Sequence, residues 1–228
     1  MTRDLIILDF DGTVCLGDAP VLAYAVEVAR AVGEPESGIL TPLEAFLSGE
    51  ARGLLAGCAD GYSAVARWAG AHGLEPRQMG AAYHASREAL ESGAVDVRTP
   101  VGLEDFLQGF DDWERVLVTN APTAGTELLV ERLGLAPLLD RVIGDAGKPD
   151  GLRRFIAPGS DGDPRLRGRI LSIGDIWRND LEPVAHAATT ALIERHPQPD
   201  ARPTFRAARI EELYGRIAHW RASPTTRA

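Results

Sequence analysis

Two carboxylates directly follow the first apolar run of the chain. Leu5 to Leu8 are four large apolar residues, and Asp9 and Asp11 follow them within a DFDG turn. Short apolar runs bounded by turn residues are typical of buried parallel strands. In open α/β sheets, ligands bind outside the carboxyl ends of the strands. The spacing therefore predicts that both carboxylates face one site at the end of a strand.

Three more polar residues follow later apolar runs in the same way. Thr119, Lys148 and Asp175 come after the runs 116–118, 142–143 and 170–173, respectively. Lys148 is the only lysine among 24 basic residues. The planar guanidinium of arginine does not reproduce a compact ammonium point charge. In a chain this rich in arginine, the single lysine therefore indicates a position that arginine cannot fill.

A parallel sheet would bring these residues together, and the hydrophobic pattern predicts one. Short apolar runs expected as strands lie at 5–8, 116–118, 142–143, 170–173 and 191–193. Helical patterns lie at 123–133, 149–155, 181–188 and 209–220. Alternating strands and helices indicate an α/β fold with a doubly wound parallel sheet.

The segment between the first two strands breaks this alternation. It has no strand-like run, and Pro and Gly residues bound helical patterns at 20–32, 42–56, 61–73 and 76–91. We expect an α-helical cap domain inserted over the strand ends. The predicted divisions are a core of residues 1–14 and 98–221, a cap of 15–97, a surface loop at 158–168 and a disordered tail at 222–228.

The bulk composition excludes several classes of function. The 228 residues are 45% hydrophobic, as expected of a globular chain, and their net charge of -9 argues against nucleic-acid binding. No apolar run is long enough to span a bilayer, and the N-terminus lacks a signal-peptide pattern, so we expect a cytoplasmic protein that does not bind membranes. Cys15 and Cys58 show neither disulfide nor zinc spacing. The oligomeric state is left open.

Four short motifs occur in a fixed order along the chain. They are DFDGTV at 9–14, LVTN at 117–120, GKP at 147–149 and GDIWRND at 174–180. Together they resemble the motifs of the haloacid dehalogenase (HAD) superfamily, in its phosphatase branch, and the helical insert resembles the cap of that family. The resemblance implies a Rossmann-like core and hydrolysis of a small phosphorylated metabolite, with Mg2+, through a phospho-aspartyl intermediate.

The resemblance also implies a role for each motif residue in phosphoryl transfer. Asp9 is the expected nucleophile, and Asp11 the expected acid and base. Thr119 and the backbone N-H of Asn120 are expected to bind phosphoryl oxygens, and Lys148 to offset charge that grows on them.

A second set of implied roles concerns the metal. Mg2+ prefers oxygen ligands, and the side chain of Asp9, the backbone carbonyl of Asp11 and the side chain of Asp175 are the expected ones. Asp180 is expected either to orient Lys148 or to support the water shell of the metal, as carboxylates that hydrogen-bond to metal ligands do.

Alternatives remain for several motif residues and for the reaction. Asp11 and Thr13 could cap a turn, Thr119 could simply end a strand, and Asp180 could cap the helix predicted at 181–188. Asp11 argues against a dehalogenase, which needs no acid there, and the lysine-free cap argues against a phosphonatase. A phosphomutase or a noncatalytic regulator that binds a phospho-metabolite stays open.

Five residues of the predicted cap could face the site and select the leaving group. They are Arg52, Tyr62, Trp68, His84 and Arg87. Such residues more often pack between helices or lie in solvent, so none is assigned to the site.

Overall fold

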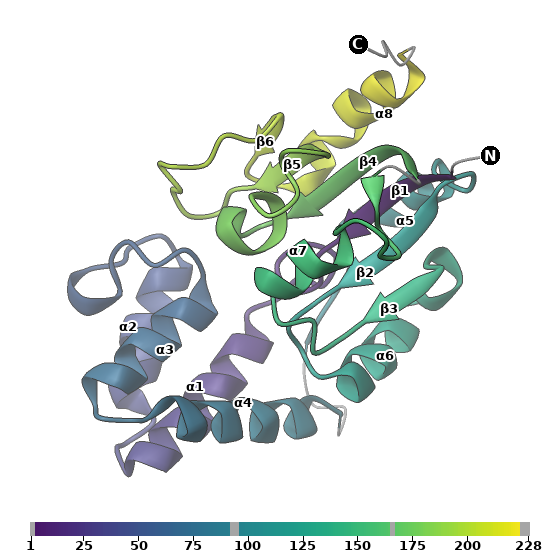
Figure 1. Ribbon diagram of the computed structural model, residues 1–228. Helices are drawn as coiled ribbons and strands as arrows, with labels where there is room; N and C mark the ends of the chain where they lie inside the picture. The colour runs from purple at the N-terminus through teal and green to yellow at the C-terminus, as the bar shows by residue number, and fades with distance from the viewer. Residues whose placement is uncertain (1–2, 92–95, 165–166, 224–228) are drawn as a thin grey trace.

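A six-stranded parallel sheet forms the centre of the computed structural model, which describes residues 3–91, 96–164 and 167–223 (Figure 1). The strand order is β3-β2-β1-β4-β5-β6. The strands are β1 (Arg3–Leu8), β2 (Glu114–Val118), β3 (Arg141–Ile143), β4 (Arg167–Gly174), β5 (Thr189–Ile193) and β6 (Phe205–Ala207). The predicted doubly wound α/β fold is confirmed.

The central strand β1 is apolar along its length because both of its faces are buried. It pairs in parallel with β2 on one side and with β4 on the other. Leu5 and Ile7 belong to one hydrophobic cluster, whereas Ile6 and Leu8 belong to another. Successive side chains of a strand point to opposite faces, so a strand covered on both sides reads as a continuous apolar run.

Helices cover both faces of the sheet. Residues of α5 (Leu103–Gln108), α6 (Thr123–Arg132) and α8 (Tyr214–Ala222) pack in the cluster that contains Ile6 and Leu8. Residues of α7 (Asp150–Phe155) pack in the cluster that contains Leu5 and Ile7. Helices thus form a layer on each face of the sheet. Because all six strands are parallel, their carboxyl ends lie along one edge between these layers.

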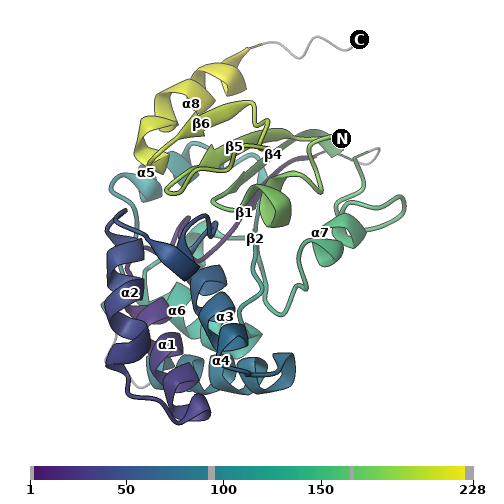
Figure 2. The same cartoon turned by 90° about the vertical axis from the view of Figure 1, so that its left-hand side faces the viewer.

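Four helices between β1 and β2 form a separate group, here called the helical lobe. They are α1 (Ala19–Val32), α2 (Ser37–Leu47), α3 (Gly61–Ala71) and α4 (Pro76–Glu91), with a short 3-10 turn at Gly53–Leu55. Their buried side chains make a hydrophobic cluster of their own, which includes Val28, Leu43 and Phe46. Figures 1 and 2 show the lobe beside the strand ends and away from the body of the sheet.

Two predicted elements differ from the observed ones, and one observed strand was not predicted. Helix α2 starts at Ser37 and runs through Pro42, where the prediction placed a helix start, because its buried residues lie on both sides of the proline. A single π-helical turn at Trp177–Leu181 followed by turns replaces the helix predicted at 181–188. Strand β6 was not predicted, since its three residues are not fully buried.

Two further predictions concern less regular parts of the chain. The segment 158–164 is a series of turns, whereas residues 165–166 of the predicted loop lie outside the described residues. Helix α8 extends to Ala222, and residues 224–228 of the predicted tail also lie outside the described part. Within the described ranges, no helix combines the length and apolar character needed to span a membrane.

Candidate active site

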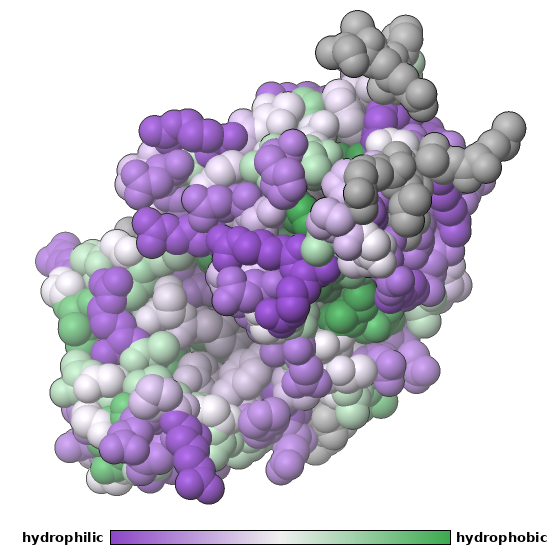
Figure 3. Space-filling view, viewed as in Figure 1, coloured by the Kyte–Doolittle hydropathy of each residue, from purple (hydrophilic) through white to green (hydrophobic). Residues whose placement is uncertain are grey.

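A cavity of about 350 Å³ lies between the carboxyl edge of the sheet and the helical lobe. The sheet contributes Asp9, Asp11, Thr119, Asn120, Ala121, Lys148, Asp175, Ile176, Asn179 and Asp180 to its lining, and the lobe contributes Tyr24, Asp60, Tyr62, Ser63, Ala66 and Tyr83. Figure 3 shows hydrophilic side chains gathered across the middle of this face of the molecule. All seven predicted site residues therefore line one cavity of a size typical for small ligands.

Asp9 leaves the end of β1 with both of its carboxylate oxygens engaged. Its backbone N-H donates to the carbonyl of Ile173 on β4 at 2.9 Å, so the sheet hydrogen bonding continues to this residue. Lys148 Nζ lies 2.6 Å from Asp9 Oδ1, and Thr13 Oγ1 donates to Asp9 Oδ2 at 3.0 Å. Thr13 thus orients the expected nucleophile, a role that the sequence did not predict.

Lys148 bridges two buried carboxylates. Its Nζ is 2.7 Å from Asp180 Oδ1 as well as 2.6 Å from Asp9, and its side chain is only 4% exposed. Burial alone would lower the pKa of Lys148, but its contacts with Asp180 and Asp9 raise that pKa above the usual range. The ammonium therefore stays charged where two anions converge.

The main chain of Lys148 is held from the neighbouring strand end. Its N-H donates to Asn120 Oδ1 at 2.6 Å, and Asn120 Nδ2 donates to its carbonyl at 3.3 Å. The side chain of Asn120 therefore fixes the Lys148 loop, which the sequence did not predict. Thr119 lines the cavity, and its hydroxyl accepts from the Ala121 N-H at 3.1 Å and, like any hydroxyl, has one hydrogen to donate.

Asp180 contacts Lys148 rather than capping a following helix. Its Oδ2 accepts the backbone N-H of Ile176 at 2.9 Å, and Ser172 Oγ donates to its carbonyl at 2.9 Å. The π-helical turn places the carboxylate back over the strand end, so of the two predicted roles the geometry matches the orientation of Lys148.

Two glycines allow the acidic side chains to approach the strand ends. A Cβ on Gly12, whose φ is +86°, would lie 2.2 Å from Asp175 Oδ2. A Cβ on Gly174 would lie 2.4 Å from Asp180 Cβ. Any side chain at either position would displace a carboxylate, because contacts this short are sterically forbidden. The glycines of the first and last motifs are therefore part of the site.

Three carboxylates of this edge lie close enough together to hold a metal ion. Oxygens of Asp9, Asp175 and Asp180 all lie within 4.8 Å of one another. Burial, followed by the charge of Asp180, raises the pKa of Asp9 to about 7 against the pull of Lys148. Burial and the charge of Asp9 raise the pKa of Asp175 well above its usual range. Unbalanced negative charge of this kind is relieved by a bound cation.

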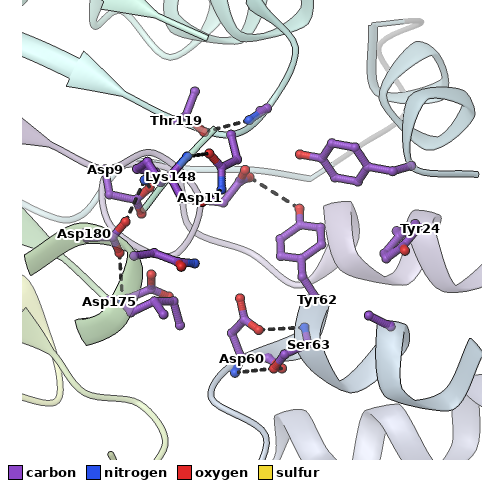
Figure 4. A pocket seen from close by; sticks show the side chains of 16 residues that line it. Asp9, Asp11, Tyr24, Asp60, Tyr62, Ser63, Thr119, Lys148, Asp175 and Asp180 are labelled. Carbon is purple, nitrogen blue, oxygen red and sulfur yellow. Dashed lines mark hydrogen bonds and ion pairs between the residues drawn. The ribbon is translucent and has the colours of Figure 1, made fainter. Parts of the chain in front are cut away.

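Asp11 faces the helical lobe and pairs there with a buried arginine. Arg87 on α4 contacts it through two nitrogens, at 2.6 Å to Oδ2 and 3.3 Å to Oδ1. Tyr62 on α3 accepts from Arg87 at 2.8 Å, and its hydroxyl lies 3.5 Å from Asp11 Oδ1. Figure 4 shows Asp11 turned toward Tyr62, with Asp9, Lys148 and Asp180 grouped on its other side.

Of the five lobe residues considered from the sequence, only Tyr62 and Arg87 contact the site. Trp68 is buried in the cluster of the lobe and stacks on His72, with ring centroids 3.7 Å apart. Arg52 and His84 are exposed. The Arg87 contact joins residues 76 positions apart, so no local pattern in the sequence distinguishes Arg87 from the other arginines.

The comparisons with known proteins bear on the fold. No family model and no curated protein sequence matches the chain. Among solved structures, the chain is similar to the HAD-type protein YfnB from Bacillus subtilis, whose structure holds magnesium, with a TM-score of 0.55 and 19% identity over 94% of this chain and 99% of that one.

Two further similar structures are named for two different reactions. A predicted phosphoglycolate phosphatase from Haemophilus somnus has a TM-score of 0.59 and 17% identity over 93% of this chain and 97% of that one. The L-2-haloacid dehalogenase from Xanthobacter autotrophicus has a TM-score of 0.54 and 15% identity over 96% of this chain and 99% of that one. The resemblance seen in the motifs is thus confirmed in the fold, and the chain has the fold of the haloacid dehalogenase-like hydrolases.

Proposed function

We propose that this protein hydrolyses the phosphate monoester of a small metabolite through a phosphorylated Asp9. The observation that carries the proposal is the placement of Asp9, which lies at the cavity with Lys148 at 2.6 Å and with Asp175 within reach of a shared cation. A phosphomonoester is close to dianionic, and such a substrate needs local positive charge before a carboxylate can approach it. The chain as a whole has a net charge of -9, so that positive charge must be concentrated in the site.

The site residues fit Mg2+, which prefers octahedral oxygen ligands. Asp9 and Asp175 would hold it with their side chains, and Asp11 with its backbone carbonyl, while Asp180 stays committed to Lys148 and to the Ile176 N-H. When bound, Mg2+ would neutralise charge on the carboxylates and on the phosphoryl oxygens. The magnesium in the similar protein YfnB supports this choice.

The first half-reaction transfers the phosphoryl group to Asp9. A carboxylate oxygen of Asp9 attacks phosphorus, and the bond from phosphorus to the leaving oxygen breaks with its electron pair. A protonated Asp11 gives its proton to that oxygen. Lys148 and the hydroxyl of Thr119 stabilise the charge on the transferring group.

The second half-reaction returns Asp9 to its initial state. Asp11, now a carboxylate, takes a proton from a water molecule whose oxygen attacks phosphorus. The bond from phosphorus to Asp9 breaks, its electron pair returns to the Asp9 carboxylate, and inorganic phosphate leaves. Asp11 ends the cycle protonated, so one residue serves both steps.

Two features of this chain favour hydrolysis of a phosphate monoester, one over the dehalogenase chemistry of a similar structure and one over phosphonatase chemistry. Asp11 supplies an acid two residues beyond the nucleophile, which dehalogenation does not need. Lys148, the only lysine, belongs to the sheet edge, so no lysine in the helical lobe can form the Schiff base of a phosphonatase. We propose that the lobe is a cap that encloses the leaving group.

Phosphate release from 4-nitrophenyl phosphate tests the proposal. We expect Mg2+-dependent release that EDTA abolishes and that falls about a thousandfold or more in Asp9→Asn, because the nucleophile is lost. Asp105→Asn, an exposed carboxylate on α5, is the matched control and should retain full activity. Full activity of Asp9→Asn, or transfer of label between positions of a sugar phosphate without free phosphate, would contradict a phospho-Asp9 hydrolase.

A further inference from the structure

Arg87 is the buried cation of the helical lobe that reaches the sheet edge. Its side chain is 5% exposed, and its two contacts with Asp11 at 2.6 and 3.3 Å form a forked pair. Such two-point contacts fix the direction of a carboxylate as well as its charge. Arg87 therefore determines how Asp11 is oriented at the cavity.

The guanidinium of Arg87 itself contacts two aromatic rings. Its Cζ lies 5.0 Å from the ring centroid of Tyr83 and 5.6 Å from that of Tyr62. Cation-π contacts of this kind strengthen when they are shielded from water. The packed rings restrict the position of Arg87, and the forked contact in turn restricts the orientation of Asp11.

Arg87 does not line the cavity, whereas Asp11, Tyr62 and Tyr83 do. A substrate in the cavity meets Asp11 and the two tyrosines first, and Arg87 lies behind them. The side chain of Asp11 keeps 19% of its surface exposed, compared with 5% for Arg87. The geometry therefore favours a residue that acts through Asp11 over one that contacts the substrate.

The paired carboxylate still has room for a water molecule. A carboxylate has about four acceptor positions on its two oxygens. Arg87 takes one position on each oxygen, and the Tyr62 hydroxyl, 3.5 Å from Oδ1, takes another on that oxygen. Among the described residues, these contacts leave one acceptor position on Oδ2, which a water molecule can occupy.

We infer that Arg87 is the positioning residue that holds the Asp11 carboxylate for the hydrolysis of phospho-Asp9. The inference rests on the proposed function and assigns Arg87 to its second half-reaction. A forked pair with a guanidinium uses the carboxylate form of Asp11, and that form takes the proton from water. Donation to a leaving group instead uses the neutral form, which a good leaving group does not require.

The test compares wild type with Arg87→Gln on 4-nitrophenyl phosphate, a good leaving group. We expect kcat to fall about tenfold or more, within the range of general base catalysis. We expect KM to fall by the same factor, because formation of phospho-Asp9 is unaffected and only its hydrolysis is slowed. Rapid mixing should then show a burst of nearly one nitrophenol per site, followed by slow turnover.

Two further variants separate positioning from structural damage. Arg67→Gln, on α3 of the same lobe, removes an exposed arginine whose side chain donates hydrogen bonds to the carbonyls of Leu54 and Ala56, away from Asp11, and should leave kcat and KM as in wild type. Arg87→Gln added to Asp11→Asn should cause no further loss, because Arg87 acts through Asp11.

The inference is overturned if kcat/KM of Arg87→Gln falls together with kcat, if neither changes, or if the losses in the double variant simply add. Should Arg87→Gln fail to fold, Arg87→Lys keeps the buried charge without the forked contact, and the same kinetic outcomes decide. Full activity of Asp9→Asn would instead overturn the proposed function. The two failures are therefore distinguishable.

Discussion

The sheet edge and the helical lobe place their site residues in different ways. At the edge, short links after the parallel strands β1, β3 and β4 bring Asp9, Lys148 and Asp175 together, and glycines keep the approach open. In the lobe, Arg87 and Tyr62 reach Asp11 from two different helices. The edge is thus built from local sequence motifs, whereas the lobe depends on how helices pack. We expect changes at the edge to remove activity and changes in the lobe to alter single steps.

The largest expected effect outside the nucleophile itself comes from Asp175→Asn. This variant removes one charge from the proposed Mg2+ ligands, so we expect a loss in rate of about a hundredfold or more. Mg2+ should also raise the melting temperature of wild type and not that of the variant, because a ligand that binds only the folded state stabilises it. A normal magnesium shift in Asp175→Asn would show that the cation lies elsewhere.

Lys148→Arg is the next largest expected effect. The ammonium lies 2.6 Å from Asp9 and 2.7 Å from Asp180 in a site with 4% exposure, and the broader guanidinium does not fit both contacts. We expect kcat/KM to fall about tenfold or more at constant fold stability. Steady-state kinetics together with thermal melts measure both quantities. Wild-type kinetics in this variant would contradict the argument that arginine cannot replace the single lysine.

A glycine-to-alanine substitution in the sheet edge and another in the helical lobe contrast the two regions directly. Gly12→Ala places a Cβ 2.2 Å from Asp175 Oδ2, whereas a Cβ on Gly80 in α4 meets no atom within 4 Å. We expect Gly12→Ala to weaken Mg2+ binding about tenfold by moving Asp175. Gly80→Ala should stabilise the protein by about 0.5 to 1 kcal/mol, since Ala favours the helix. Calorimetric titration with Mg2+ and urea unfolding would test the pair, and equal effects at both positions would contradict the contrast.

The last expected effect is a pH dependence of the free energy of unfolding in the metal-free protein. The pKa of Asp9 is raised from 3.8 to about 7 in the folded state. Between these values the folded protein holds a proton that the unfolded chain has lost, so the free energy of unfolding decreases as pH rises through this window.

Urea unfolding in EDTA at pH 5 and pH 7.5 measures this dependence. The free energy of unfolding should decrease less from pH 5 to pH 7.5 in Asp9→Asn than in wild type, whereas the control Asp105→Asn should behave as wild type. An equal decrease in wild type and in Asp9→Asn would show that Asp9 does not hold a proton in this range.

The contrast between the two regions also explains what the sequence could predict. Strand β1 and the residues after it were predictable because a short apolar run, a turn glycine and clustered carboxylates are local signals. The pairing of Arg87 with Asp11 was not predictable, because it depends on how α4 packs against α1 and α6, 76 residues along the chain from Asp11. The roles of Thr13 and of the Asn120 side chain were missed because turn residues have several possible partners.

Among the secondary structure elements, errors arose where local rules competed with packing. Pro42 was read as a helix start, but the apolar stripe of Ile39, Leu43 and Phe46 continues through it and is buried as one face. Strand β6 is too short and too exposed to give a hydrophobic signal, and it is defined by its pairing with β5.

The central claim is that Asp9 carries the phosphoryl group during turnover. Acid quenching during steady-state hydrolysis, followed by borohydride reduction, converts an acyl phosphate of aspartate to homoserine, which peptide mass spectrometry detects at its position. We predict homoserine at residue 9 in wild type, a larger fraction of it in Arg87→Gln, and none in Asp9→Asn. Turnover without homoserine at residue 9, or with homoserine at another aspartate, would contradict the mechanism.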